Sequence, residues 1–418
     1  MSLTDSLDAR LARFASTRDP AELWPGLSEA ARVAAAREIA RLTGIVLRSH
    51  VALDGEPHLD REGRHDSYAL AIAAHTTGMG PVLGRWLEDG RIAAHERHRA
   101  SLAAHLDHSR RRVARLRAGV LPAIDALLAR GIPVTALKGY HTGSAYFDEP
   151  GARRMSDVDV MIPAECMQDA GVAIAQAGFS LASPALVPHK LEWIAAGVDA
   201  RTHSVEVSDE CTGWTLETHT SLDRRYAEGT WAHLDAISRT RPCELDGRRL
   251  RALDPASLLI SLACHCSEEL EASRLLRLFE IIQVIRIETD AGALAWDDVF
   301  DRLCSARAMR FVYPAFSLVE QLAPGTIDAR IMNASLKDST WFAKHTVSRL
   351  VPGGGRIDDR GLMRQFMWTS GSAALARRLS HRFSPANTIP GDARPGWRAH
   401  LRRLASGALS LRAPDERP

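Results

Sequence analysis

Two aspartates, Asp157 and Asp159, lie inside an apolar run of the sequence and point most directly to chemistry. Side chains of a β-strand alternate with period two, so both carboxylates would lie on the same face. Two like charges on one face need a partner, and a divalent cation such as Mg²⁺ binds carboxylate and phosphate oxygens. The Asp-x-Asp pattern therefore predicts transfer of a phosphorus group, with nucleotidyl transfer as the first hypothesis.

Lys138 is a second candidate, because lysine is rare in this chain. Of the 53 basic residues only four are lysine, namely Lys138, Lys190, Lys337 and Lys344. Lys138 follows the apolar run 132–137 directly. An ammonium group makes a compact point-charge contact to phosphate, which the planar guanidinium of arginine does not reproduce. We expect Lys138 to contact a phosphate, and a solvated residue at a strand end is the alternative.

The elements that must position these residues form three regions, 1–118, 119–245 and 246–418. Apolar periodicity predicts helices in the first region, and short apolar runs with glycine turns predict a small sheet in the second. Asp254 and Pro255 give a good helix start in the third region. The tail after residue 384 is rich in proline, and we expect it to be partly loose. The predicted helices are 28–48, 68–86, 93–117, 121–129, 140–147, 165–177, 273–287, 296–303 and 309–322, and the predicted strands are 132–137, 157–162, 205–207 and 214–219.

Composition excludes several classes of protein. The chain has 418 residues, 45% of them hydrophobic and 25% charged, which is typical of soluble globular proteins. A net charge of +2 argues against a surface that coats nucleic acid. No secretory signal and no spanning apolar run is visible, and six cysteines without framework spacing fit a reducing cytoplasm. The Cys264-His265-Cys266 run has no second pair at zinc-site spacing, so we do not expect a zinc site.

Several short motifs together resemble a known family. The chain is similar to the bacterial proteins described as uncharacterised nucleotidyltransferases, within the polymerase-beta-like nucleotidyltransferase superfamily, and the similarity extends nearly from end to end. One departure is that a Gly-Gly or Gly-Ser pair usually stands closer to the first aspartate than Gly139 does, and Gly143-Ser144 fits that spacing instead. Another is Glu280, where the family tends to carry aspartate. The resemblance rests on Leu137-Lys138-Gly139, Tyr146, Arg153, Asp157-Val-Asp159-Val, Gly178-Phe179, Leu216-Glu217-Thr-His219, the stretch from Ala73 to Leu87 and the stretch from Leu253 to Glu280.

The resemblance implies a set of site residues. Asp157, Asp159 and Glu217 would be the catalytic residues and would hold Mg²⁺, with two ions expected, while Glu206 is the rival for the place of Glu217. Arg154 and His265 are weaker candidates. The residues expected to bind the nucleotide are Lys138, Gly139, Ser144, Arg153 and His219.

The resulting interpretation is an α+β protein whose small mixed sheet carries the site, flanked by mainly helical regions. The expected reaction moves a nucleoside monophosphate, with AMP as the first choice, from a nucleoside triphosphate to a hydroxyl or phosphate of a small-molecule or peptide acceptor. Pyrophosphate would leave. Alternatives are phosphoryl transfer from the same site, a non-catalytic nucleotide-binding scaffold, and a toxin-type enzyme acting on transfer RNA. We expect a cytoplasmic protein without nucleic-acid or membrane partners, and the resemblance favours tailoring or resistance-type modification of a natural product.

Overall fold

The computed structural model describes residues 7–17, 22–48, 56–182, 189–198, 213–227, 230–270, 275–352 and 367–368. The amino-terminal region is helical, as predicted. The expected helix 68–86 is two helices, because Gly78 adopts a left-handed conformation with φ of 78° and ends the first of them. The elements of this region are α1 (Leu7–Thr17), α2 (Glu29–Arg48), α3 (Ser67–Thr77), α4 (Gly80–Glu88) and the two short strands β1 (His58–Leu59) and β2 (Ala93–Ala94).

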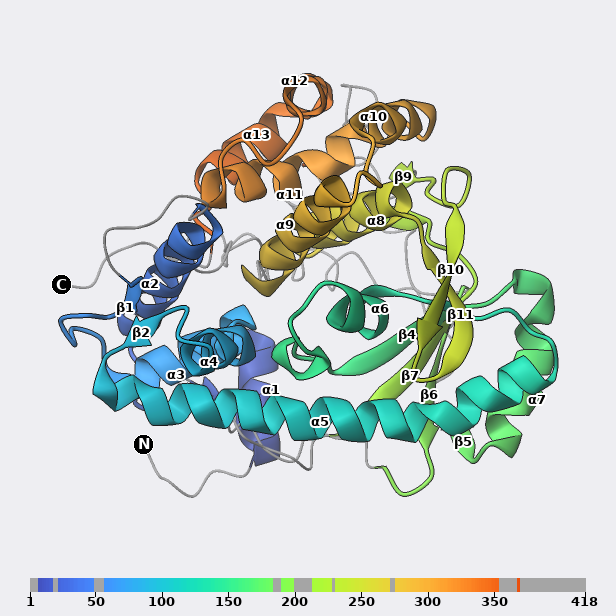
Figure 1. The fold of residues 1–418 in the computed structure, drawn as a ribbon, viewed down its shortest axis with the longest axis horizontal. Helices are drawn as coiled ribbons and strands as arrows, with labels where there is room; N and C mark the ends of the chain where they lie inside the picture. Colours follow the sequence, from blue (N-terminus) through green and yellow to red (C-terminus); the bar gives the residue numbers. More distant parts are fainter. Residues whose placement is uncertain are drawn as a thin grey trace, which may run out of the picture.

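Helix α5 (Glu96–Ala129) connects the amino-terminal region to the sheet. Two separate helices, 93–117 and 121–129, were predicted here, and they are one helix of 34 residues with Pro122 inside it. Figure 1 shows α5 running beneath both the amino-terminal helices and the sheet. The domain boundary near residue 118 stays a prediction, and the helix itself is continuous across it.

A seven-stranded mixed sheet forms the centre of the molecule, which makes the fold α+β as predicted. Strand order is β10-β11-β3-β4-β7-β6-β5. The pairs β11–β3 and β4–β7 are parallel, and the other neighbours are antiparallel. The strands are β3 (Thr135–Ala136), β4 (Asp157–Met161), β5 (Phe179–Leu181), β6 (Lys190–Ala195), β7 (Thr215–His219), β10 (Thr240–Leu245) and β11 (Arg248–Leu253).

The strand predictions were right for β4 and β7 and incomplete elsewhere. Only two residues of the apolar run 132–137 pair as a strand. Strand β11 lies in the region 246–418, which was predicted to be helical, and yet it belongs to the sheet, between β10 and β3. Exposed Arg249 and Arg251 alternate with buried Leu250 and Ala252, a period-two pattern that the sequence interpretation missed. The predicted strand 205–207 lies outside the described residues.

Helices flank the sheet and close over it. Helix α6 (Lys138–Ala145) follows β3, and α7 (Met167–Gln176) follows β4 and ends before Gly178, which has φ of 89°. A two-stranded sheet of β8 (Arg224–Ala227) and β9 (Thr230–Ala232) leads back toward the carboxy-terminal helices. These helices are α8 (Pro255–Glu268), α9 (Leu275–Asp290), α10 (Trp296–Ser305), α11 (Met309–Leu322), α12 (Ala329–Asp338) and α13 (Trp341–Ser348).

The carboxy-terminal helices begin where the sequence predicted. Asp254 caps α8 by accepting a hydrogen bond from the amide of Ser257, and Pro255 occupies the first turn. The predicted loose tail lies outside the described residues. Within the described part of the chain, none of the helices has the length and apolar composition that crossing a membrane requires.

The two largest hydrophobic cores among the described residues hold these layers together. One core lies between the sheet, α5 and α7 and includes Val158 and Leu216. The larger core joins the amino-terminal helices to α8, α9 and α11, and in it the rings of Trp86 and Phe279 meet edge to face at 5.5 Å. The two helical regions at opposite ends of the sequence therefore share one hydrophobic core. This core lies near the end of the sheet at which β4 begins (Figure 1).

Candidate active site

Asp159 and Glu217 face each other on neighbouring strands. Strands β4 and β7 are parallel, and their register pairs Asp159 with Glu217 and Met161 with His219. Val158, Val160 and Leu216 alternate with these polar residues and are completely buried in the cores. Burial of the apolar set fixes the register, because a shift by one residue would turn every side chain to the other face. The polar residues are thereby directed together to the opposite face.

The side chains of Asp159, Glu217 and His219 form a compact cluster. One potential ligand atom from each lies within 4.8 Å of the others. Nε2 of His219 is 2.8 Å from Oδ1 of Asp159 and 3.4 Å from Oε2 of Glu217. Both carboxylates are buried, with 3% and 7% of their surface exposed. Two buried carboxylates and an imidazole can accept a divalent cation, or can share protons among themselves.

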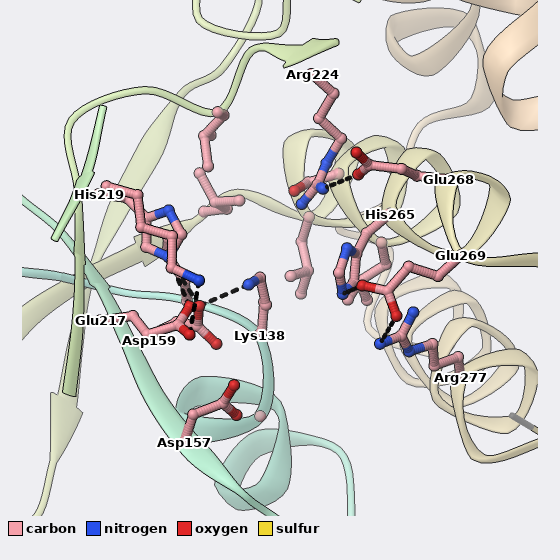
Figure 2. Close-up of a pocket in the computed structure, with 18 of the residues that line it drawn as sticks. Lys138, Asp157, Asp159, Glu217, His219, Arg224, His265, Glu268, Glu269 and Arg277 are labelled. Carbon is pink, nitrogen blue, oxygen red and sulfur yellow. Dashed lines mark hydrogen bonds and ion pairs between the residues drawn. The ribbon is translucent and has the colours of Figure 1, made fainter. Parts of the chain in front are cut away.

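Two lysines already neutralise this cluster. Nζ of Lys138 is 2.6 Å from Oδ1 of Asp159, and Nζ of Lys190 is 2.7 Å from Oε1 of Glu217. The sequence led us to expect a divalent cation as the partner of these carboxylates. Ammonium groups of the protein already supply part of the compensating charge, so the clustering does not by itself require a metal ion. Figure 2 shows Lys138 directed toward the carboxylates of Asp159 and Glu217.

The ionisation of Asp159 follows from these contacts. Burial alone would favour its neutral form, but the charge of Lys138 and the hydrogen bond from His219 outweigh burial and hold the pKa of Asp159 well below its ordinary value. Burial lowers the pKa of Lys190, but the hydrogen bonds and charges of Glu217 and Glu192 together outweigh burial, so the pKa of Lys190 is raised. Asp159 and Lys190 are therefore both charged at neutral pH.

Asp157 lies apart from this cluster. Its side chain is partly buried and accepts a hydrogen bond of 3.2 Å from the hydroxyl of Ser156. It is not one of the three residues whose ligand atoms lie within 4.8 Å of one another. Figure 2 shows it near the start of α6. Burial raises the pKa of Asp157, and the charges of Asp159 and Glu217 raise it further. Asp157 lines the same cavity as the cluster, so a ligand bound there can bring the three carboxylates together.

The backbone at Lys138 is strained. Its φ of 40° lies in the left-handed region, which residues other than glycine rarely adopt. The carbonyl of Lys138 accepts a hydrogen bond of 2.8 Å from Thr142, and the amide of Leu137 donates to the carbonyl of Asp159 at 3.0 Å. These bonds, with the ammonium contact to Asp159, hold the strained conformation. Strain of this kind is concentrated at functional sites.

Gly139 gives space to Arg153. A Cβ atom at Gly139 would lie 2.1 Å from Nη1 of Arg153, which is far closer than van der Waals contact permits. Arg153 in turn makes two hydrogen bonds to the buried carboxylate of Glu280 on α9, at 2.8 and 3.0 Å. Glu280 also accepts a hydrogen bond from Thr142 of α6. Arg153 and Glu280 thus tie the helix after β3 to α9, and the guanidinium is not free to approach a phosphate without leaving Glu280.

A cavity of about 780 Å³ opens in front of the carboxylates. Strands β4 and β7 form one wall, and α8 and α9 form the other, as Figure 2 shows. His265 lies on the helical wall, where burial and the charges of nearby arginines hold its pKa well below the ordinary value, so that the imidazole is neutral. The helical wall also carries two ion pairs, between Arg224 and Glu268 and between Arg277 and Glu269.

The structure brings most, but not all, of the predicted residues to this cavity. Ser144 is not among the residues that line it, and its hydroxyl accepts a hydrogen bond from Arg117 instead. Arg154 does line the cavity and donates to the carbonyl of His75 at 3.0 Å. Glu206 lies outside the described residues. The predicted residues found in the cavity lining are Lys138, Gly139, Arg153, Asp157, Asp159, Glu217, His219, His265 and Glu280.

Lys190 is the site residue that the sequence interpretation missed. It is one of only four lysines among 53 basic residues, so the rarity that drew attention to Lys138 holds for it too, although Lys190 does not follow an apolar run. Its strand was not predicted, although Pro188 and Gly197 stand on either side of it as turn signals. Once β6 is paired to β7, Lys190 lies opposite His219 and beside Glu217. Glu268 and Arg277 lie in the stretch from Leu253 to Glu280 that carries the family resemblance, but neither was named as a site residue, and Arg224 lies outside the motifs.

The family of the chain identifies it as a transferase of phosphorus groups. The chain belongs to the family described as uncharacterised nucleotidyltransferase, whose model matches residues 64–324. This confirms the family resemblance seen in the sequence, and the protein is a nucleotidyltransferase by family. The match includes the sheet, helices α8 and α9 and the whole of the cavity lining. No curated protein matches the chain.

Two solved structures resemble part of the chain. One is the antibiotic-resistance factor ANT(2'')-Ia, with 13% identity and a TM-score of 0.27, covering 45% of this chain and 89% of that protein. Another is an antigenic nucleotidyltransferase-like protein from Paracoccidioides brasiliensis, with 13% identity and a TM-score of 0.27, covering 40% of this chain and 75% of that one. At this level of similarity, neither structure bears on the substrates of this chain.

Proposed function

We propose that the protein transfers a nucleoside monophosphate, with AMP from ATP as the first candidate, to a hydroxyl or phosphate of a small-molecule or peptide acceptor. The observation that carries this proposal is the cluster of Asp159, Glu217 and His219 within 4.8 Å, on the wall of a cavity of about 780 Å³. The cavity has room for a nucleotide, since ligand sites commonly measure about 300–1,000 Å³. Family membership supports the same reaction class.

The donor set fits a hard divalent cation. Carboxylate oxygens are preferred by Mg²⁺, and Asp157, Asp159 and Glu217 would hold it. When bound, Mg²⁺ would neutralise charge on the triphosphate and on the leaving pyrophosphate. His219 completes a set that Mn²⁺ or Zn²⁺ can also use, because imidazole is a good ligand for transition metals. The sequence leads us to expect two ions.

The protein residues would position the reacting groups and take up the proton. An acceptor oxygen attacks the α-phosphorus, a new oxygen–phosphorus bond forms, and the bond from that phosphorus to the bridging oxygen of the β-phosphate breaks. Pyrophosphate leaves with the electron pair of that bond. Glu217 is the carboxylate that we assign to accept the proton of the acceptor. Lys138 lines the same cavity and would contact the phosphates. Such catalysis depends mainly on positioning and on preorganised charge.

The acceptor would enter from the side of α8 and α9. This wall faces the carboxylates across the cavity, and its polar side chains include His265, Glu268, Glu269 and Arg277 (Figure 2). Glu268 pairs with Arg224 and Glu269 pairs with Arg277, so these two pairs do not select an acceptor by net charge. We therefore keep the acceptor class as a hydroxyl-bearing or phosphate-bearing small molecule or peptide.

A labelling experiment tests the reaction. Purified protein is incubated with Mg²⁺, each of the four α-labelled nucleoside triphosphates and a panel of acceptors, and both label transfer and pyrophosphate are measured. Asp159→Asn is the matched inactive variant, and we expect its turnover to fall by about 100- to 1,000-fold, the typical effect of removing one key electrostatic group. Retention of Mg²⁺-dependent turnover by Asp159→Asn would refute the assignment.

Product analysis separates the alternatives. Phosphoryl transfer would release a nucleoside diphosphate, whereas nucleotidyl transfer releases pyrophosphate. A scaffold would bind nucleotide without either product, and a toxin-type enzyme would label transfer RNA in preference to small acceptors. A bacterial source, the polymerase-beta-like superfamily and a cytoplasmic location belong to this proposal as the expectations drawn from the sequence.

A further inference from the structure

Lys190 occupies an unusual position between two glutamates. Strands β6 and β7 are antiparallel, and their register places Glu192 directly opposite Glu217. Like charges directly opposite each other on neighbouring strands destabilise a sheet. Nζ of Lys190 lies 2.7 Å from Oε1 of Glu217 and 3.1 Å from Oε1 of Glu192. The ammonium group therefore bridges the two carboxylates and removes their repulsion.

The two oxygens of Glu217 consequently face different partners. Oε1 contacts Lys190, while Oε2 lies 3.4 Å from Nε2 of His219, on the side of Asp159. A divalent cation shared by Asp159 and Glu217 can use Oε2. A second cation on the other side of Glu217 would have to displace Lys190 or bind beside a positive charge.

We propose that Lys190 occupies a second cation site between Glu217 and Glu192, so that the nucleotide-free protein binds one divalent cation at its carboxylates instead of two. This inference rests on the proposed function for the first cation and adds the role of Lys190 to it. The chain carries 49 arginines and four lysines, and an ammonium group is the side chain that resembles a compact cation most closely. Lys190 is a positioning residue here, because it acts through Glu217.

The charge balance favours the same conclusion. Asp157, Asp159, Glu217 and Glu192 contribute four negative charges, and Lys138 and Lys190 contribute two positive ones. One divalent cation therefore neutralises this group of side chains before any phosphate arrives. A second divalent cation would make the group positive in a partly buried setting, where charges interact more strongly than in water.

Counting bound Mn²⁺ tests this inference without any turnover. The electron paramagnetic resonance signal of free Mn²⁺ is measured during titration of the nucleotide-free full-length protein. We expect one Mn²⁺ per chain for the wild type and two for Lys190→Met. Lys190→Arg keeps the positive charge and should bind one. Lys337→Met removes an exposed lysine of α12 and should also bind one, which controls for the loss of a surface charge.

A double variant separates a cation site from a structural effect. Glu192→Gln in the Lys190→Met background should return the count to one, because the second site loses a ligand. Two ions in the wild type, or one ion in both the wild type and Lys190→Met with equal affinity, would overturn the inference. Absence of Mn²⁺ binding in every variant would overturn it together with the metal dependence of the proposed function. Circular dichroism confirms that each variant is folded, and if Lys190→Met fails to fold, Lys190→Gln replaces it.

Discussion

Asp159 on β4 and Glu217 on β7 are directly paired residues of two parallel strands, and both are buried. Their carboxylates share His219 as a neighbour, and each of them also contacts a different lysine. This arrangement holds the pKa of Asp159 well below its ordinary value, chiefly through the charge of Lys138, although Asp159 is buried beside a second carboxylate. The environment of Asp157 has the opposite effect and raises its pKa, chiefly through burial.

Asp157→Asn should make the protein more stable and less active. The pKa of Asp157 is raised by burial and by the charges of Asp159 and Glu217, so its ionised form costs folding free energy at neutral pH. Asparagine removes that charge at similar volume, and we expect a gain of about 1 kcal/mol at pH 7 in urea unfolding. The gain should disappear as pH falls, because the wild-type carboxyl is then neutral as well. A destabilised Asp157→Asn protein at pH 7 would contradict this account.

Gly139→Ala and Gly143→Ala form a matched pair within α6. The first places a Cβ atom 2.1 Å from Nη1 of Arg153, whereas the second makes its nearest contact at 3.5 Å, an ordinary distance. We expect Gly139→Ala to cost about 1–3 kcal/mol through overpacking. Gly143→Ala should instead stabilise the helix by about 0.5–1 kcal/mol. Urea denaturation of both variants checks the difference, and equal effects would show that the contact with Arg153 does not matter.

Glu280→Ala should destabilise the fold strongly. Its side chain is 2% exposed and that of its partner Arg153 is 14% exposed, so the substitution leaves a buried guanidinium without its partner. Loss of one member of a buried ion pair costs about 3–5 kcal/mol. Asp107→Ala breaks an exposed pair with Arg111, 66% and 55% exposed, and should cost less than about 1 kcal/mol. Comparable losses in the two variants, measured by urea unfolding, would mean that Arg153 finds other partners.

His265 should make stability sensitive to mild acid. Its pKa in the folded protein lies well below the ordinary value of 6.5, so below that pH the unfolded chain binds a proton that the folded chain does not. Folding stability therefore falls as pH decreases through the unfolded pKa, by at most about 1.4 kcal/mol per pH unit for one group.

The control for this effect is His265→Asn, which cannot take up the proton. As pH falls from about 7 to about 5, the wild type should lose more unfolding free energy than His265→Asn does. His105 and His141 also have lowered pKa values, of about 4 each, but they are present in both proteins and cancel. A difference that does not depend on pH would show that His265 is protonated equally in the folded and unfolded states.

The sequence determined the local elements of the site. Apolar neighbours and period-two spacing were enough to place Asp157 and Asp159 on one strand and Glu217 and His219 on another, because burial of alternate residues is a local property of a strand. The helix cap at Asp254 and the helix end at Gly78 are likewise determined by the local sequence, since each depends on the conformation of a single residue.

Tertiary structure decided which of these elements meet. The pairing of β4 with β7, the place of β11 beside β3 and the bond between Lys190 and Glu217 depend on contacts between segments far apart in sequence. Ser144 had suitable chemistry and spacing, yet its hydroxyl faces Arg117. The type and spacing of residues decide which functional groups the chain offers for a site. Strand register and burial decide which groups become neighbours, and these neighbours set the pKa of each group and its access to a ligand.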